Sequence, residues 1–248
     1  MIILSILFFV TALIYSSVGF GGGSTYLAIL LIWGVPYTIF PVIALVCNII
    51  VVSGNSINFI RSKNINFNLL FPYLIGSIPF AFIGGSITIE KSLFEILLFC
   101  VLLVAGIFLL IESKSFNKEQ IKINKIPRLI SISIGSIIGF MSGIVGIGGG
   151  IFLSPFLFLM KAGYPRHITS SASLFILINS IFGIAGQLTK DQILDQVIIY
   201  WPLFLSVLVG GQIGSVLNIK FLPNKILALL TSFLVIFVAI RIGIKLIA

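Results

Sequence analysis

The sequence predicts an all-α, polytopic membrane protein made of two tandem repeats. Three observations support this fold class. The chain of 248 residues is 59% hydrophobic and only 8% charged, and no charged side chain precedes Arg61. Its apolar residues form eight long blocks. Two of these blocks contain nearly the same glycine-rich stretch. Such low charge spread over long apolar blocks is typical of membrane-spanning helices.

The apolar blocks have two lengths. Six are close to the roughly 20 residues that cross a bilayer as a helix, whereas the first and fifth run to about thirty. In chain order they cover approximately residues 3–33, 38–60, 68–88, 93–111, 129–160, 168–188, 197–217 and 226–247. Apart from Glu95, charges fall only near the ends of these blocks.

The two longest blocks contain the glycine runs, which span residues 19–23 and 146–150. Four glycines in five positions cost a helix roughly 1 kcal/mol each relative to alanine, so each helix should break there. Each break leaves a piece of 16 to 18 residues and a piece of about ten. The short pieces are either half-helices of one broken crossing or return arms of re-entrant hairpins. Irregular backbone at membrane depth must be buried in protein or line a cavity, so the breaks mark the candidate site.

The two halves of the chain repeat at a nearly constant offset. Gly146 follows Gly19 by 127 residues, and Asn179 follows Asn48 by 131. This predicts a first transmembrane repeat over 1–112, a linker over 113–128 and a second repeat over 129–248. The stretch from Glu112 to Arg128 carries five basic residues and is predicted to be cytoplasmic.

The direction of the repeats stays open at this stage. Parallel halves would place ten basic residues inside and five outside, whereas inverted halves would place eleven inside and four outside. Inversion is slightly favoured, because Lys161, Arg166, Lys220 and Lys225 then all face the cytoplasm. Residues 1–5 lack the basic region of a signal peptide, so we expect the N-terminus to be retained.

Small residues follow a four-residue spacing in the helices that lead into the glycine runs. Gly135, Gly139 and Gly143 form one such row, and Gly210 and Gly214 share the spacing. Rows of this kind let helix backbones approach closely in membranes, so helix packing is their expected role.

The second half contains the stretch GFMSGIVGIGGGIFLSPFLFLMKAGYPRHITSSASLF. It resembles the TauE/SafE family of sulfite exporters, also called the toluene sulfonate uptake permease family. The motif positions are Gly146, Gly148 to Gly150, Pro155, Gly163, Pro165 and the run Thr169 to Ser173. The first half matches less fully, since Ala28 replaces the motif proline and Phe40-Pro41-Val42 replaces the serine-rich run. The resemblance implies transport of small sulfur oxyanions or organosulfonates.

The residues themselves also point to an anion site. A helix that starts just after a glycine run presents free N–H groups and the positive end of its dipole, which together bind anions without a formal charge. Two such starts would converge if the repeats pack about a pseudo-twofold axis. The candidate substrate-binding residues are Gly21, Gly22, Gly23, Ser24, Thr25, Asn48, Gly148, Gly149, Gly150, Ile151, Ser170, Ser171 and Asn179.

Two sets of polar side chains have alternative interpretations. Asn48, Asn55 and Ser56 share one helix face, as do Asn179, Gly183 and Gln187, and either set could bond neighbouring helices or contact substrate. Arg166 and His167 are interpreted first as interfacial anchors and second as residues that attract an anion.

Several functions are disfavoured by composition. One histidine with the remote Cys47 and Cys100 cannot supply a metal-ligand set, and both cysteines are interpreted as packing residues. No serine has a plausible base, so we expect neither an enzyme nor a cofactor. The net charge of +9 lies in loops, where it suits lipid headgroups rather than nucleic acid.

The sequence therefore predicts a transporter of small anions in the cell membrane. Export of sulfite, related sulfur oxyanions or organosulfonates is favoured, because coupled carriers commonly hold an intramembrane carboxylate or histidine and only the shallow Glu95 is present here. Uptake coupled to an ion gradient, or a non-transporting assembly subunit, are the alternatives.

Overall fold

The computed structural model is all-helical over the residues that it describes, which are 1–63, 65–115, 123–190, 193–217 and positions 233, 236, 239–240 and 243–244. Most of the predicted eighth block, 226–247, and linker residues 116–122 lie outside this part. The elements are α1 Ile2–Val18, α2 Gly23–Trp33, the 3-10 turn η1 Tyr37–Ile39, α3 Phe40–Arg61, α4 Phe67–Ser86, α5 Lys91–Ser115, α6 Arg128–Val145, α7 Gly150–Leu159, α8 Pro165–Gln187, α9 Ile193–Ile198 and α10 Trp201–Leu217.

Helix lengths confirm the membrane class. Among the described residues, four helical segments are long and apolar enough to cross a bilayer: 37–61, 67–86, 128–145 and 166–187. Four further helices are apolar but shorter, and these are α1, α2, α7 and α10. Helix α5 continues to Ser115, so the beginning of the predicted linker is helical.

Both predicted helix breaks are present. Helix α1 has 17 residues and α2 has 11, with the break at residues 19–22 between them. Helix α6 has 18 residues and α7 has 10, and residues 146–149 separate them. Glycine therefore ends each long piece and begins each short piece, as the cost of glycine in a helix predicts.

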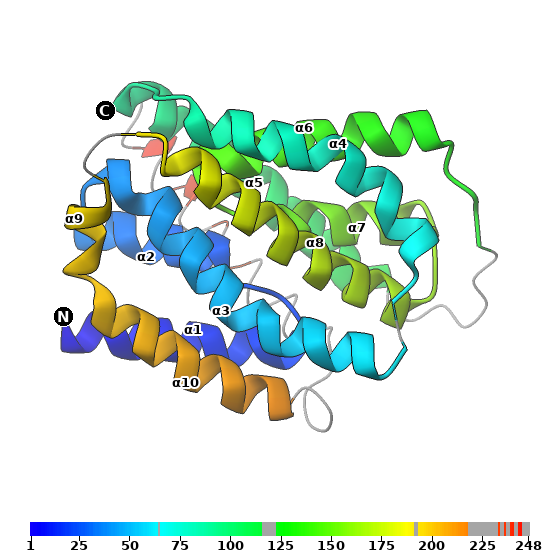
Figure 1. The fold of residues 1–248 in the computed structure, drawn as a ribbon, viewed down its shortest axis with the longest axis horizontal. Helices are drawn as coiled ribbons and strands as arrows, with labels where there is room; N and C mark the ends of the chain where they lie inside the picture. The colour runs from blue at the N-terminus through cyan, green and yellow to red at the C-terminus, as the bar shows by residue number, and fades with distance from the viewer. Residues whose placement is uncertain are drawn as a thin grey trace.

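The short helices are return arms of helical hairpins, because the chain reverses direction at each glycine break. The N–H of Asn124, just before α6, donates to the carbonyl oxygen of Lys161, just after α7, over 3.0 Å. The side-chain amide of Asn124 also donates to the Met160 carbonyl oxygen over 3.2 Å. The beginning of α6 and the end of α7 therefore lie at the same end of the molecule. Figure 1 shows the same reversal between α1 and α2.

The glycine rows pack helices against one another, as expected. A Cβ atom added at Gly139 of α6 would lie 2.7 Å from the Ser77 Cα of α4, and one at Gly135 would lie 2.9 Å from the Tyr73 Cα. A Cβ at Gly214 of α10 would lie 2.9 Å from the Ser16 Cβ of α1. The backbones of α4 and α6, and of α1 and α10, thus lie in direct contact (Figure 1).

Helices α3 and α8 lie side by side at the centre of the molecule and run in opposite directions (Figure 1). The Ser56 and Ser173 hydroxyl oxygens lie 3.4 Å apart toward one end. A Cβ at Gly183 would lie 3.1 Å from Leu45 Cδ1 toward the other end. Each of these helices follows a hairpin in the sequence. Because α3 and α8 lie at the centre, the breaks of both hairpins lie close to the core.

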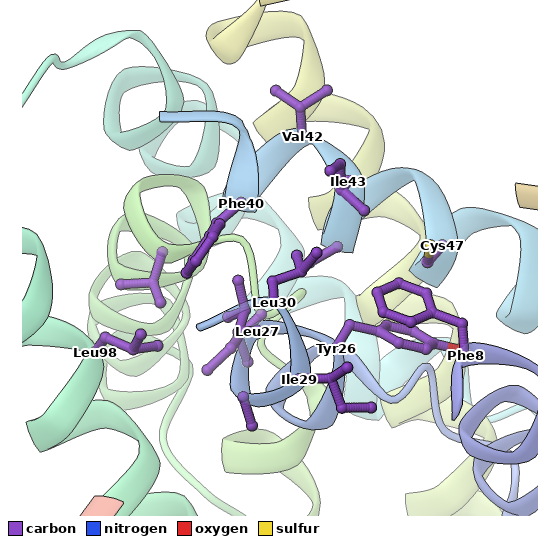
Figure 2. Packing of buried hydrophobic residues seen from close by; sticks show 14 of the residues in the cluster. Phe8, Tyr26, Leu27, Ile29, Leu30, Phe40, Val42, Ile43, Cys47 and Leu98 are labelled. Atoms are coloured by element: carbon purple, nitrogen blue, oxygen red, sulfur yellow. The ribbon is translucent and has the colours of Figure 1, made fainter. Parts of the chain in front are cut away.

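Helix α2 is enclosed by the main hydrophobic core. Residues 23–30 are all buried, and the Phe8 and Tyr26 rings stack with centroids 4.8 Å apart (Figure 2). Cys47 is part of this cluster, as its interpretation as a packing residue predicts. For Cys100 that interpretation is wrong, because its side chain is exposed on α5; both cysteines are free thiols. Burial of α2 places the first irregular backbone inside protein, where a break can be tolerated at membrane depth.

Candidate functional site

Backbone geometry explains why glycine occupies the breaks. Gly19 ends α1 in the left-handed region with φ 88°, and its N–H donates to the Ser16 carbonyl oxygen over 3.0 Å. Gly22 precedes α2 with φ 86°. In the second run, Gly146, Gly148 and Gly149 have φ values of 89°, 83° and 79°. Residues with a Cβ rarely adopt such angles, so glycine allows each chain to reverse sharply.

Each return arm begins with N–H groups that its own helix leaves without an acceptor. In α2 the first helical bonds run from the N–H groups of Thr25 and Tyr26 to the Gly22 carbonyl oxygen. The N–H groups of Gly23 and Ser24 precede that ladder and have no intrahelical acceptor. In α7 the first bonds run to the Gly149 carbonyl oxygen, so the N–H groups of residues 150 and 151 are in the same position. Neither helix has a side-chain cap.

Asn48 of α3 contacts both glycine runs. Its amide nitrogen donates to the Ile147 carbonyl oxygen in the second run over 3.0 Å. A Cβ added at Gly21 of the first run would collide with the Asn48 Oδ1. Cβ atoms at Gly23 and Gly148 would each lie 2.7 Å from the Asn48 Nδ2. Since Asn48 is fully buried, the two breaks and this amide form one enclosed cluster.

The cluster contains polar atoms that protein groups leave unsatisfied. Because Asn48 uses its nitrogen on Ile147, its Oδ1 is the free end of the amide. Within the described part of the chain, this oxygen and the Ser180 hydroxyl, which would lie 3.1 Å from a Cβ at Gly148, have no hydrogen-bond partner. An unsatisfied buried polar group costs about 1–3 kcal/mol, so each of these atoms suits a water or a bound molecule. The hydroxyl can donate to an anion, and the amide oxygen can accept from a water or a protonated oxyanion.

Other predicted residues lie around this cluster. A Cβ at Gly22 would face Thr11 and Tyr15 at 3.2 Å, and one at Gly149 would face Ile138 at 2.8 Å. The Thr25 hydroxyl lies 2.6 Å from the Tyr15 hydroxyl. These three residues shape the breaks and do not face Asn48.

The predicted residues of α8 are buried but have different surroundings. Ser170 donates to the His167 carbonyl oxygen over 3.1 Å, and the Asn179 nitrogen donates to the Phe175 carbonyl oxygen over 2.9 Å. Ser171 is fully buried, and its hydroxyl has no partner among the described residues. Asn179, the predicted counterpart of Asn48, therefore bonds its own helix instead of the opposite glycine run.

Two residues that the sequence analysis did not select also contact the runs. Ile176 Cγ2 would lie 3.2 Å from a Cβ at Gly21 and 2.9 Å from one at Gly148, and the Ser180 hydroxyl would lie 3.1 Å from the latter. Residues 176 and 180 are four apart and so share a face of α8. The signal that could have found them is this helical spacing, which places Ser180 on the same face as Ile176 and not on the face of Asn179.

The remaining amides hold the helices that lead into the breaks. The Asn55 nitrogen donates to the Ser16 carbonyl oxygen over 3.0 Å, and the Gln187 nitrogen donates to the Gly143 carbonyl oxygen over 2.8 Å. Ser16 and Gly143 stand three residues before Gly19 and Gly146, respectively. These bonds to neighbouring helices favour the packing interpretation for Asn55 and Gln187.

Among the described residues, charged groups lie outside the cluster. Arg166 is exposed at the turn before α8, and the His167 ring makes an edge contact with Tyr164 at 5.8 Å between centroids. Glu95 is 8% exposed in the second turn of α5. No group of three metal-ligating side chains occurs in the described residues.

The fold and the site define a class: a multi-pass α-helical membrane protein in which two buried return arms begin at glycine breaks that meet. A family model described as "Sulfite exporter TauE/SafE" matches residues 4–242. The chain belongs to the TauE/SafE sulfite exporter family, and it is a membrane transporter rather than an enzyme.

Relatives cover almost the whole chain. A probable membrane transporter protein of Sinorhizobium fredii is 29% identical over 93% of both chains. One of Methanocaldococcus jannaschii is 28% identical over 94% of this chain and 91% of its own. A sulfite exporter TauE/SafE family protein of Arabidopsis thaliana is 34% identical over a shorter stretch, 26% of this chain and 14% of its own. No solved structure matches significantly.

Proposed function

We propose that this transporter exports a small sulfur oxyanion, sulfite above all, or an organosulfonate across the cell membrane. The description of the family and the name of the plant relative support the substrate class. The anion would bind where the two glycine runs meet. No cofactor is required, because the site consists of backbone N–H groups and neutral side chains.

One observation carries this proposal: the Asn48 amide lies between the two breaks and bonds the Ile147 carbonyl oxygen. It thereby joins the beginning of α2 to the beginning of α7. The N-terminus of a helix carries roughly half a positive charge, and its first N–H groups point outward. Two such ends beside one amide would replace the water around an anion without placing a lysine or arginine in the membrane.

The proposed site has central residues, which would contact the anion, and surrounding residues, which shape the breaks and the path. Gly21, Gly23, Asn48 and Gly148 form the centre, with the N–H groups of Ser24, Gly150 and Ile151 as donors. Gly22, Gly149 and Thr25 maintain the shape of the breaks. Ser170, Ser171 and Asn179 line the α8 side of the proposed path.

We further propose that the two halves, 1–112 and 129–248, are inverted repeats. The predicted correspondence maps α1 onto α6 and α4 onto α10. It therefore maps the contact between α1 and α10 onto the contact between α6 and α4, and both are present. The opposite directions of α3 and α8 support inversion, as do the two re-entrant hairpins, which leave three crossings per half (Figure 1).

Inversion makes a topological prediction. With the linker in the cytoplasm, cysteines placed at Ser62 and Lys125 should react with a membrane-impermeant maleimide only after the cells are opened, whereas one at Ala248 should react in intact cells. The basic residues would then lie eleven inside and four outside, in line with the positive-inside rule. Labelling of Ala248 only in opened cells would contradict inversion and favour parallel halves.

The energetics favour export. An anion that leaves an inside-negative cell gains about 2.3 kcal/mol per charge per 100 mV, so efflux needs no coupled ion. Uptake of the same anion runs uphill electrically and would need an ion-binding group. Glu95 is the one acidic side chain buried among the described residues, and it lies near an end of α5 rather than beside the glycine runs.

The test of substrate class is a flux assay with purified protein in liposomes. Vesicles loaded with radiolabelled sulfite should release it faster than protein-free vesicles, and unlabelled organosulfonates should compete, whereas unlabelled phosphate should not. Equal release from both kinds of vesicle, for sulfite and for a labelled sulfonate, would contradict the proposed function.

A further inference from the structure

A polar cavity of about 440 Å³ lies at the end of the molecule opposite the linker. It opens between η1, the C-terminal ends of α4 and α8, and the beginning of α5. Its described lining is rich in hydroxyl and amide groups: Thr38, Ser86, Thr88, Gln187, Thr189 and Gln196. A volume of this size is in the usual range of small-molecule sites, roughly 300–1,000 Å³.

Lys190 is the one charged side chain among the described residues that line this cavity. Its ammonium donates to the Gln187 Oε1 over 2.9 Å, a neutral partner, and Lys190 forms no ion pair within the described part of the chain. Partial burial lowers the pKa of Lys190, because removal from water disfavours the ammonium form. A bound anion would restore the electrostatic balance at this position.

The cavity leads toward the second glycine run. Gln187, which accepts from Lys190, donates its own nitrogen to the Gly143 carbonyl oxygen over 2.8 Å. Ile144 and Pro41 form part of the wall. A Cβ added at Gly146 would lie 3.0 Å from the Pro41 carbonyl carbon, so the glycine run begins directly behind that wall.

We propose that this cavity is a second anion-binding site, a vestibule in which Lys190 concentrates small sulfonates and sulfur oxyanions on their way to or from the glycine runs. This assignment rests on the proposed function for the identity of the ion. The attraction follows from geometry, since a single cation inside a concave wall with neutral polar groups focuses its field on the cavity. Gln187 fixes the position of that cation relative to α6.

The test measures the local potential directly and needs no transport. In a protein with Cys47→Ala and Cys100→Ala, a cysteine replaces the exposed Thr88 of the cavity lining. Its modification rates are compared for two methanethiosulfonate reagents of similar size, one ending in a sulfonate and one in a trimethylammonium. Lys190→Gln should lower the ratio of anionic to cationic rate roughly tenfold, whereas Lys190→Arg should preserve it.

Lys91→Gln is the matched control. It removes the same charge from the same end of the molecule, but Lys91 is exposed and does not line the cavity. This variant should leave the ratio within about twofold of the parent, given screening at physiological salt. Methanesulfonate added in excess should slow the anionic reagent in the parent and not in Lys190→Gln. Equal ratios in the parent and Lys190→Gln, or equal effects of Lys190→Gln and Lys91→Gln, would overturn the vestibule.

Flux separates this inference from the proposed function. If the parent transports sulfite and Lys190→Gln has lost the reagent selectivity, flux at low sulfite should fall roughly fivefold and recover at saturating sulfite. A parent that transports no sulfur anion but retains selectivity would contradict the proposed function alone. A parent that transports sulfite while Lys190→Gln changes neither selectivity nor flux would contradict the vestibule alone.

Discussion

Gly21→Ala should reduce sulfite flux to the level of protein-free vesicles. Gly21 has no positive φ, so alanine adds no backbone strain, and its methyl group instead collides with the Asn48 Oδ1. The Asn48 side chain would have to leave its place between the two runs, and its bond to the Ile147 carbonyl oxygen would be lost. Flux in liposomes checks this result, and gel filtration with thermal unfolding in detergent checks that the variant is folded.

Gly34→Ala is the matched control for this variant. Gly34 also follows a helix and has φ 73°, and no atom lies within 4 Å of an added Cβ. Its alanine therefore carries strain of about 1–2 kcal/mol without a collision, and flux should stay close to that of the parent. Retained flux in Gly21→Ala, or equal loss in both variants, would contradict the placement of the site at Asn48.

Asn48→Asp should lower flux by about a hundredfold or more. The side chains have the same shape, but aspartate brings a negative charge to the point where the anion would bind. Two like charges 4 Å apart repel by about 4 kcal/mol at an effective dielectric constant of about 20. The carboxylate also cannot donate to the Ile147 carbonyl oxygen as the amide does. Initial rates over a range of sulfite concentrations would separate weaker binding from slower turnover.

Asn55→Asp separates charge at the site from damage to the helix. Asn55 lies two turns further along α3, where it donates to the Ser16 carbonyl oxygen. This variant loses an equivalent bond and gains the same charge, at a position that does not contact the glycine runs. We expect lower thermal stability with most of the flux retained. Similar flux in the two aspartate variants would show that Asn48 has a structural role only.

Much of this fold could be predicted because it follows from local rules. The cost of glycine in helices located both breaks, and block lengths separated the long arms from the short ones. The four-residue spacing of Gly135, Gly139 and Gly143 indicated the contact between α6 and a neighbour. It could not identify that neighbour as α4, because the choice of partner depends on contacts between distant parts of the chain.

The site was less accessible from the sequence. The sequence offset predicts equivalent positions for Asn48 and Asn179 in the two halves, yet Asn48 bonds the opposite glycine run and Asn179 bonds its own helix. Sequence spacing places both on a helix face but does not specify which amide reaches across. The sequence does not predict the vestibule for a related reason. Lys190 lies just after the end of α8, and it lines one cavity with Thr38 and Thr88 because the fold brings these distant residues together.

The most direct test of the central claim is potential-driven flux. Liposomes containing the purified protein and radiolabelled sulfite receive an inside-negative potential from a potassium gradient and valinomycin, with no sodium or proton gradient. We predict rapid sulfite efflux that rises with the potential, that persists in Glu95→Gln and that disappears in Gly21→Ala. Efflux that appears only when an ion gradient is added, and that Glu95→Gln abolishes, would contradict uncoupled export through a site of backbone N–H groups.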